Sequence, residues 1–235
     1  MEKVIVALRR TDADDSWCSR LRGPVAQQLL DLGLPGLTIH VKDEQVRHSL
    51  MTLTTLDPPV CGFVSLWTQQ SYGPQVQQAV ELLAGECDAV HAYLVTESVP
   101  LPPPVTDNGA RTAGFANIAL LRRPADLDEA TWLSRWQIAH TPVAIATQST
   151  FGYVQNAVVR ALTPDAPELA AVVEELFPIE AVSDLHAFFG AADDADLSDR
   201  MTQMIASTSA FGANENIDTV PTSRYVLRSA FGPER

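Results

Sequence analysis

One histidine in the sequence is well placed to transfer protons. Leu133, Trp136 and His140 are spaced at i, i+3 and i+7, so they share one stripe of a predicted helix that faces a sheet. Burial against apolar and aromatic neighbours disfavours the charged imidazolium, so His140 is predicted to be a neutral base near pH 7 if a substrate reaches it. The alternative, which helix geometry alone favours, is a core histidine that hydrogen-bonds a backbone carbonyl or closes its helix.

The segment that follows this helix, residues 150–159, is predicted to form a strand with polar side chains on both faces. Alternation puts Tyr153 and Gln155 on one face of the sheet and Val154 and Asn156 on the other. Two amides and a phenol need hydrogen-bond partners when they are buried. This strand therefore indicates either a wet cavity or a purely structural polar network.

Four further side chains complete the predicted site. Glu180 is expected to interrupt an apolar strand, where burial would raise its pKa unless it meets a donor; an exposed position at a sheet edge is the simpler alternative. Trp132, Trp136 and Phe151 are expected to form apolar walls of the kind that ligand pockets show. Ordinary core packing is the alternative for these aromatic residues.

Sequence motifs for common cofactors and metals are missing. There is no glycine-rich phosphate loop, no GxSxG elbow and no HExxH pattern. The histidines are predicted to lie in different elements, and the three cysteines lack CxxC spacing, which favours buried reduced thiols over a disulfide framework or a zinc site. We therefore predict that the protein uses no metal and no organic cofactor.

The composition argues against several classes of partner. The chain has 235 residues, of which 46% are hydrophobic and 19% charged, enough for large buried cores. Its 29 acidic and 16 basic residues give a net charge of −13, which repels nucleic acid and anionic membranes. No apolar run reaches the roughly 18–20 residues that cross a bilayer, and the first residues read as a strand rather than a signal peptide. A cytoplasmic protein without nucleic-acid or membrane partners is expected.

An internal repeat is the strongest pattern in the sequence. Three short segments of the first half recur in the second: residues 6–10 (VALRR) as 119–123 (ALLRR), 17–20 (WCSR) as 132–135 (WLSR), and 24–26 (PVA) as 142–144 (PVA). Later strands are matched as 38–41 with 153–156, 63–67 with 178–182, and 93–95 with 225–227. Each copy therefore has the order strand, helix, strand, strand, helix, strand, which is that of a ferredoxin-like fold.

A proline-rich segment separates the two copies. Prolines remove amide donors and force extended backbone, so residues 98–112 are predicted to be a linker without helix or central strand. The expected domains are residues 1–97, the linker, and residues 113–235. In the second copy, the first helix is expected to stop at Pro142 for the same reason.

The second copy resembles the EthD-type members of the dimeric α/β-barrel superfamily across residues 112–228. The resemblance is carried by Trp136, His140 and Pro142 in the first helix, by Tyr153-Val154-Gln155-Asn156 in the next strand, and by Ile179-Glu180-Ala181 before Ser183 and Leu185. It implies an α+β fold in which tandem ferredoxin-like units pack their antiparallel sheets into one intrachain barrel, and each sheet can close a ligand cavity with its own helices. The first copy lacks the helix histidine and has Arg22-Gly23 in the gap, so its site is expected to be inactive.

The resemblance implies a cofactor-independent enzyme, of oxygenase or cyclase and dehydratase type, that acts on a small hydrophobic aromatic or polyketide-like compound. In this hypothesis His140 transfers a proton, Tyr153 and Asn156 orient or polarise the substrate oxygen, and Gln155 and Glu180 bind substrate. Two alternatives stay open: a non-catalytic small-molecule-binding or accessory protein with the same cavity, and a purely structural barrel. A homodimer is one expected assembly.

Overall fold

The computed structural model describes residues 1–231 and contains two copies of one β-α-β-β-α-β unit. The first copy consists of β1 (Glu2–Arg9), α1 (Asp15–Arg20), the π-helix η1 (Leu21–Val25), α2 (Ala26–Asp31), β2 (Gly36–Val41), β3 (Val60–Thr68), α3 (Pro74–Ala84) and β4 (Ala89–Leu101). The second consists of β5 (Phe115–Leu121), α4 (Glu129–Leu133), the π-helix η2 (Ser134–His140), α5 (Thr141–Thr147), β6 (Gly152–Ala161), β7 (Ala171–Phe177), the 3-10 helix η3 (Ile179–Val182), α6 (Leu185–Phe189), α7 (Asp194–Ser209) and β8 (Asp218–Arg228). The predicted order of elements is confirmed.

The eight strands form one closed antiparallel barrel in the order β1-β3-β2-β8-β5-β7-β6-β4. Within each copy the strands follow the same ferredoxin-like order. At the two seams, the second strand of one copy pairs with the last strand of the other, as β2 with β8 and β6 with β4. Closure leaves no sheet edge open to solvent. The predicted fold class, with two ferredoxin-like repeats closing an intrachain barrel, is thus the observed one.

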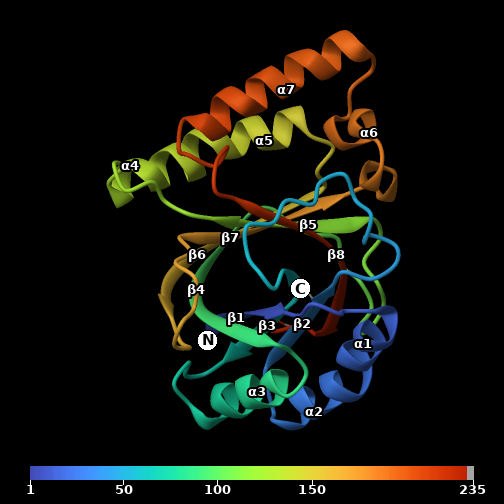
Figure 1. Cartoon of the computed structure of the whole chain (residues 1–235), viewed down its shortest axis with the longest axis vertical. Helices are drawn as coiled ribbons and strands as arrows, with labels where there is room; N and C mark the ends of the chain where they lie inside the picture. The colour runs from blue at the N-terminus through green and yellow to red at the C-terminus, as the bar shows by residue number, and fades with distance from the viewer. Residues whose placement is uncertain (232–235) are drawn as a thin grey trace.

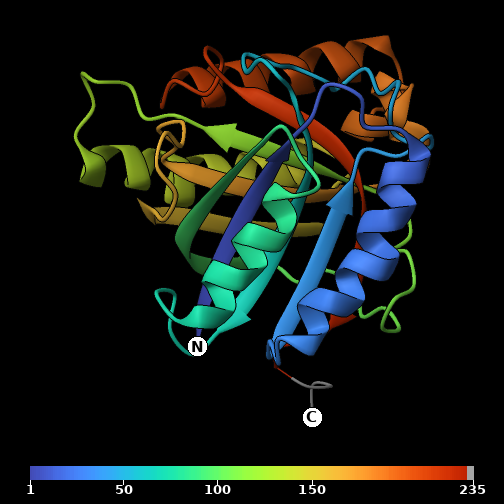
Figure 2. The same cartoon turned by 60° about the horizontal axis from the view of Figure 1, so that its bottom comes forward.

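Helices cover the barrel on two opposite sides. In Figure 1 the barrel is seen end-on, with α1, α2 and α3 below it and α4 to α7 above it. Figure 2 shows α1, α2 and α3 lying along the outside of the first-copy sheet. No helix among residues 1–231 is long and apolar enough to cross a membrane.

Alternation along the strands divides the core into an inner and two outer layers. One outer layer packs the first sheet against its helices and includes Leu37, Ile39 and Val64. The other packs the second sheet against its helices and includes Trp136 and Tyr153. The barrel lumen holds a third cluster of buried side chains: Ile5, Ala7, Val60, Phe63, Tyr93, Val95, Ala116, Ile118, Leu120, Leu169, Val172, Leu176 and Val220.

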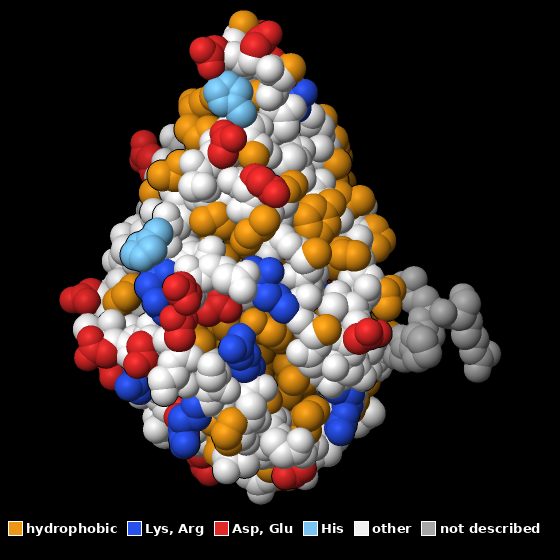
Figure 3. Space-filling model, turned by 90° about the vertical axis from the view of Figure 1, so that its right-hand side faces the viewer, with side chains coloured by type: hydrophobic (Ala, Val, Ile, Leu, Met, Phe, Trp, Pro, Cys, Tyr) orange, Lys and Arg blue, Asp and Glu red, His pale blue; other side chains and the backbone are white. Residues whose placement is uncertain are grey.

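Charges of both signs lie close together on one face of the molecule (Figure 3). Figure 3 shows one face, on which Lys and Arg side chains gather mostly in the lower half, beside Asp and Glu. Pairs such as Arg47 with Asp15, at 2.8 Å, are of this exposed kind. Such pairs contribute little to stability individually.

The prediction that the helix stops at Pro142 is wrong. The helix continues through Pro142 as α5, because the turn before it, η2, is a π-helix. There the Thr141 N–H bonds to the Trp136 carbonyl, five residues back. A widened turn removes the clash that a proline ring makes with the carbonyl four residues before it. The first copy does the same in η1, which contains Pro24.

The strand predicted at residues 178–182 is also wrong. The third strand of the second copy is β7, and residues 179–182 form the 3-10 helix η3 that follows it. Pro178 comes between the two and supplies no backbone donor for the ladder. The counterpart of β3 in the second copy is therefore β7, which lies before the predicted segment.

The linker is shorter than the predicted residues 98–112. Residues 98–101 continue β4, where Ser98 pairs with Gln155 and Leu101 with Tyr153 on β6. The register shifts between these two pairs, so Pro100 lies at an irregularity where a missing N–H costs least. The division into residues 1–97, 98–112 and 113–235 stays a proposal, and its last four residues lie outside the described part of the chain.

We expect alanine at Gly114 to destabilise the protein strongly. Gly114 has φ +78°, and a Cβ there would lie 2.0 Å from the Phe177 carbonyl oxygen on β7. Gly109 is the matched control, because it has φ +83° and nothing within 4 Å of a Cβ. Gly109→Ala should lower the free energy of unfolding by about 1 kcal/mol because of its left-handed backbone conformation. Gly114→Ala should lower it by roughly 2 kcal/mol more because of the clash. Urea unfolding measures both, and equal losses would contradict the close approach of β5 to β7.

Candidate functional site

His140 lies at the end of η2 and points inward, between the second sheet and its helices. Only 6% of its surface is exposed. Its Nδ1 is 2.9 Å from the Ser207 hydroxyl on α7, and its ring packs on Phe211 at 4.8 Å between centroids. Burial lowers the pKa of His140 to about 4. The imidazole is therefore neutral at physiological pH.

A cavity of about 170 Å³ reaches this imidazole. Its walls are mostly apolar and aromatic: Met51, Trp136, Phe188, Phe189, Met204 and Phe211. Apolar walls with a few converging polar groups are typical of sites for small molecules. Tyr153 on β6 and Glu175 on β7 line the same cavity.

Tyr153 and Glu175 face each other across neighbouring strands. They are paired residues in the β6–β7 ladder, so both side chains lie on the helix side of the sheet. Burial raises the pKa of Glu175 to about 8. Burial, reinforced by the Glu175 charge, also raises the pKa of Tyr153. At pH 7 the carboxyl, the phenol and the imidazole are thus all predominantly neutral, and the cavity suits an uncharged ligand.

Two amide oxygens in the cavity have no partner. Asn117 Oδ1 on β5 and Gln148 Oε1 after α5 are buried and accept no hydrogen bond from any residue in the described part of the chain. Both residues line the cavity. Buried polar atoms are rarely left unpaired, so these oxygens are available to a ligand that brings hydrogen-bond donors.

The first copy roofs this cavity of the second. Met51, which lines it, belongs to the connection between β2 and β3. This connection bonds to the second copy at several places. Leu53 forms an antiparallel bridge with Thr219, the Leu50 N–H donates to the Val182 carbonyl, and the Thr55 N–H donates to the Asp218 carboxylate. In Figure 1 it rises from the barrel toward the region of α6. The site therefore depends on both copies.

Several predicted site residues lie outside the cavity. Asn156 faces the barrel lumen, where its amide donates to the Val172 carbonyl at 3.0 Å, so it is not brought together with His140. Phe151 packs against the lumen cluster. Gln155 is on the helix side, but its amide is committed to the Thr141 hydroxyl at 2.6 Å. Glu180 is exposed on η3, because the strand expected there is β7.

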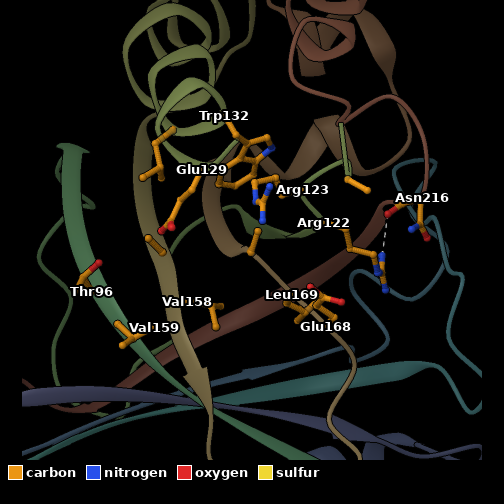
Figure 4. Close-up of a pocket in the computed structure, with 14 residues that line it drawn as sticks. Thr96, Arg122, Arg123, Glu129, Trp132, Val158, Val159, Glu168, Leu169 and Asn216 are labelled. Carbon is orange, nitrogen blue, oxygen red and sulfur yellow. Dashed lines mark hydrogen bonds between the residues drawn. The ribbon is translucent and has the colours of Figure 1, made fainter. Parts of the chain in front are cut away.

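Trp132 supports the cavity from behind. It packs on Trp136 at 5.0 Å between ring centroids, and its indole N–H donates to the Phe211 carbonyl at 3.1 Å. Its other side borders a separate surface hollow of about 970 Å³. Figure 4 shows Arg123, Glu129 and Trp132 along the helix side of that hollow and Glu168 opposite. This larger hollow mixes charges of both signs and does not contain His140.

The sequence reasoning missed Glu175. Two consecutive glutamates within a run of apolar residues, AVVEELF, were the available signal. Such a run reads as a buried strand, and a carboxyl on it must be either paired or neutral. Among residues 1–231, no group of three His, Cys, Asp or Glu side chains is arranged so that it could hold a metal ion.

At the position equivalent to η2, the first copy carries an arginine contact in place of a histidine. Arg22 donates to the Tyr225 hydroxyl at 2.5 Å and lies 3.9 Å from Asp43. The inactive site predicted for this copy stays a prediction.

Comparisons with known proteins show the fold. No protein-family model matches the sequence, and no curated protein does. Similar solved structures include an anthrone oxidase-like protein, with 7% identity, a TM-score of 0.52 and coverage of 100% of this chain and 97% of that one. Chlorite dismutase from Candidatus Nitrospira defluvii has 9% identity, a TM-score of 0.48 and coverage of 96% and 92%. A candidate monooxygenase from Lactobacillus acidophilus NCFM has 11% identity, a TM-score of 0.48 and coverage of 97% and 96%. The EthD-type resemblance stays a prediction.

Glu175→Gln should stabilise the protein at alkaline pH. The pKa of Glu175 is about 8 in the folded chain, above its ordinary value of 4.5, so folding favours the protonated form. The contribution of Glu175 to the free energy of unfolding is therefore largest below pH 4.5. It decreases by on the order of 4 kcal/mol as the pH rises to 8. The variant should therefore equal the parent near pH 4 and exceed it at pH 8. Urea unfolding measures this, with exposed Glu180→Gln as the control; a parallel pH dependence in parent and Glu175→Gln would contradict the burial of this carboxyl.

Proposed function

We propose that the protein is a cofactor-independent enzyme that transfers a proton on a small hydrophobic aromatic or polyketide-like compound bound in the His140 cavity. The observation that carries the proposal is the neutral, buried imidazole in an apolar cavity beside two neutral acids. The fold shared with the anthrone oxidase-like protein is consistent with such a role and assigns no substrate.

The groups have complementary roles in this proposal. The Ser207 hydroxyl holds Nδ1 of His140, which leaves Nε2 as the nitrogen that accepts a proton from an activated carbon or a phenol. Glu175 and Tyr153 keep their protons at pH 7 and donate hydrogen bonds to the substrate oxygen as it gains charge. The product of this step is an enolate or phenolate. Such an electron-rich anion is the common starting point for reaction with dioxygen, for cyclisation and for loss of water.

Asn156 has no part in this proposal, and Gln155 and Glu180 are not substrate contacts in it. The lumen position of Asn156 and the exposed position of Glu180 leave Tyr153 and Glu175 as the groups that polarise the substrate. The homodimer and the cytoplasmic location also stay predictions.

Proton transfer can be measured directly with anthrone, whose activated methylene group exchanges with deuterium. We expect the protein to accelerate this exchange in D₂O, followed by NMR, and His140→Ala to reduce the acceleration at least ~100-fold while binding changes little. His186→Ala, at a more exposed histidine on α6, is the control. Binding with an exchange rate unaffected by His140→Ala would favour the non-catalytic binding protein. If the protein neither binds anthrone nor accelerates its exchange, the result favours the structural barrel for this class of compound.

The pH dependence of the same exchange should be bell-shaped. The acid limb is expected near pH 4, where His140 becomes protonated, and the alkaline limb near pH 8, where Glu175 loses its proton. Glu175→Gln should remove the alkaline limb and leave the acid limb in place. An alkaline limb that persists in this variant would assign the acid role to another group.

A further inference from the structure

A second hollow, of about 160 Å³, lies at one mouth of the barrel lumen. It is on the opposite face of the second sheet from the His140 cavity. Val154 and Glu174 line it, whereas their chain neighbours Tyr153 and Glu175 line the other cavity. The two spaces are separated by the strands β6 and β7, so a ligand in one does not contact a ligand in the other.

The walls of this lumen mouth carry an excess of positive charge in an acidic protein. Lys3, Arg224 and Arg228 line it together with only two acids, Glu97 and Glu174. Burial raises the pKa of Glu174, but the charges of Arg224, His40 and Lys3 outweigh it and hold that pKa well below its ordinary value. Both glutamates are already engaged: Glu97 accepts from Lys3, and Glu174 Oε1 lies 2.6 Å from Arg224 Nε.

These two ion pairs do not use all the hydrogen-bond donors at the lumen mouth. The Lys3 ammonium has three N–H donors, of which Glu97 takes one. Thr38 and Ser65 are residues with only 4% and 3% of their surface exposed; they pair across β2 and β3 and line the hollow. A serine or threonine hydroxyl that lines the hollow can donate a hydrogen bond to an acceptor bound there.

Aromatic and aliphatic side chains complete the lumen mouth. Lys3 Nζ lies 4.9 Å from the centroid of the Trp67 ring, and Phe231 packs edge-on against Trp67 at 6.4 Å. Val154 and Val226 lie beside them. The space corresponds to roughly five water molecules at about 30 Å³ each, which is the scale of a single-ring compound.

We propose that the lumen mouth is a second binding site, for a small aromatic carboxylate. The carboxylate accepts hydrogen bonds from the Thr38 and Ser65 hydroxyls and from Lys3, and the flat apolar body packs between Trp67 and Val154. The charge of the ligand distinguishes this site from the His140 cavity, which holds only neutral groups at pH 7. The inference does not depend on the proposed enzymatic function.

Calorimetric titration with benzoate tests this site. We expect saturable 1:1 binding with a Kd of about 1 mM or tighter, and at least tenfold weaker binding of benzamide, the neutral molecule of the same shape. The double variant Thr38→Val, Ser65→Ala should weaken benzoate binding at least tenfold, and exposed Thr202→Val should leave it unchanged. Lys3→Met should also weaken it, whereas Lys42→Met, at the other lysine of the chain, should not.

NMR of the unaltered protein provides a test that does not depend on the folding of any variant. Nuclear Overhauser effects from the benzoate ring protons should reach the Trp67 indole. Effects to Phe211 or Trp136 instead, or loss of benzoate binding in His140→Phe, would place the ligand in the other cavity and overturn the proposal. Equal affinity for benzoate and benzamide, or no saturable binding of benzoate, would overturn it as well and leave the lumen mouth as a hydrated opening.

Discussion

The structure depends on the closure of its sheet. A closed barrel covered by helices on two sides buries both faces of most strands, so successive residues enter different interiors. A polar side chain on such a strand has no route to bulk water. It must meet a partner, lose its charge or face an internal space, and the strands of this protein show all three outcomes.

Glu174 and Glu175 are the clearest example. They are neighbours on β7, yet the carboxyl that faces the lumen is held ionised by Arg224 and His40, and the carboxyl that faces the helices is held protonated by burial alone. The difference arises from the charges that each interior supplies, since the residue type is the same. One sheet thereby separates a polar lumen mouth from an apolar cavity.

The internal repeat made the architecture predictable. The matched segments VALRR with ALLRR and WCSR with WLSR gave the order of elements, and the resemblance added the closure of the two copies into one barrel. The local errors have separate physical causes. A π-helix carries no periodic pattern of its own, so Pro142 read as a stop. Because β7 contains two glutamates, its sequence does not read as a continuous apolar strand, and the strand was predicted around Ile179 instead.

Part of the candidate site could be predicted from helical spacing and strand alternation. The helical stripe correctly placed Trp136 and His140 against the sheet, and strand alternation correctly separated Tyr153 from Asn156. Combining Tyr153 and Asn156 in one site ignored that alternation. The place of Glu175 in the site depends on the register of β7 with β6, which pairs it with Tyr153, and the sequence alone did not fix that register.

The roof over the His140 cavity has an evolutionary consequence. The first half of the chain has no counterpart of His140, yet it supplies Met51 to the cavity. The loop that carries Met51 is hydrogen-bonded to β8 and η3 of the second half. Exchange of one half for that of a distant homologue would keep the cavity closed only if the new half brought a loop that makes matching contacts.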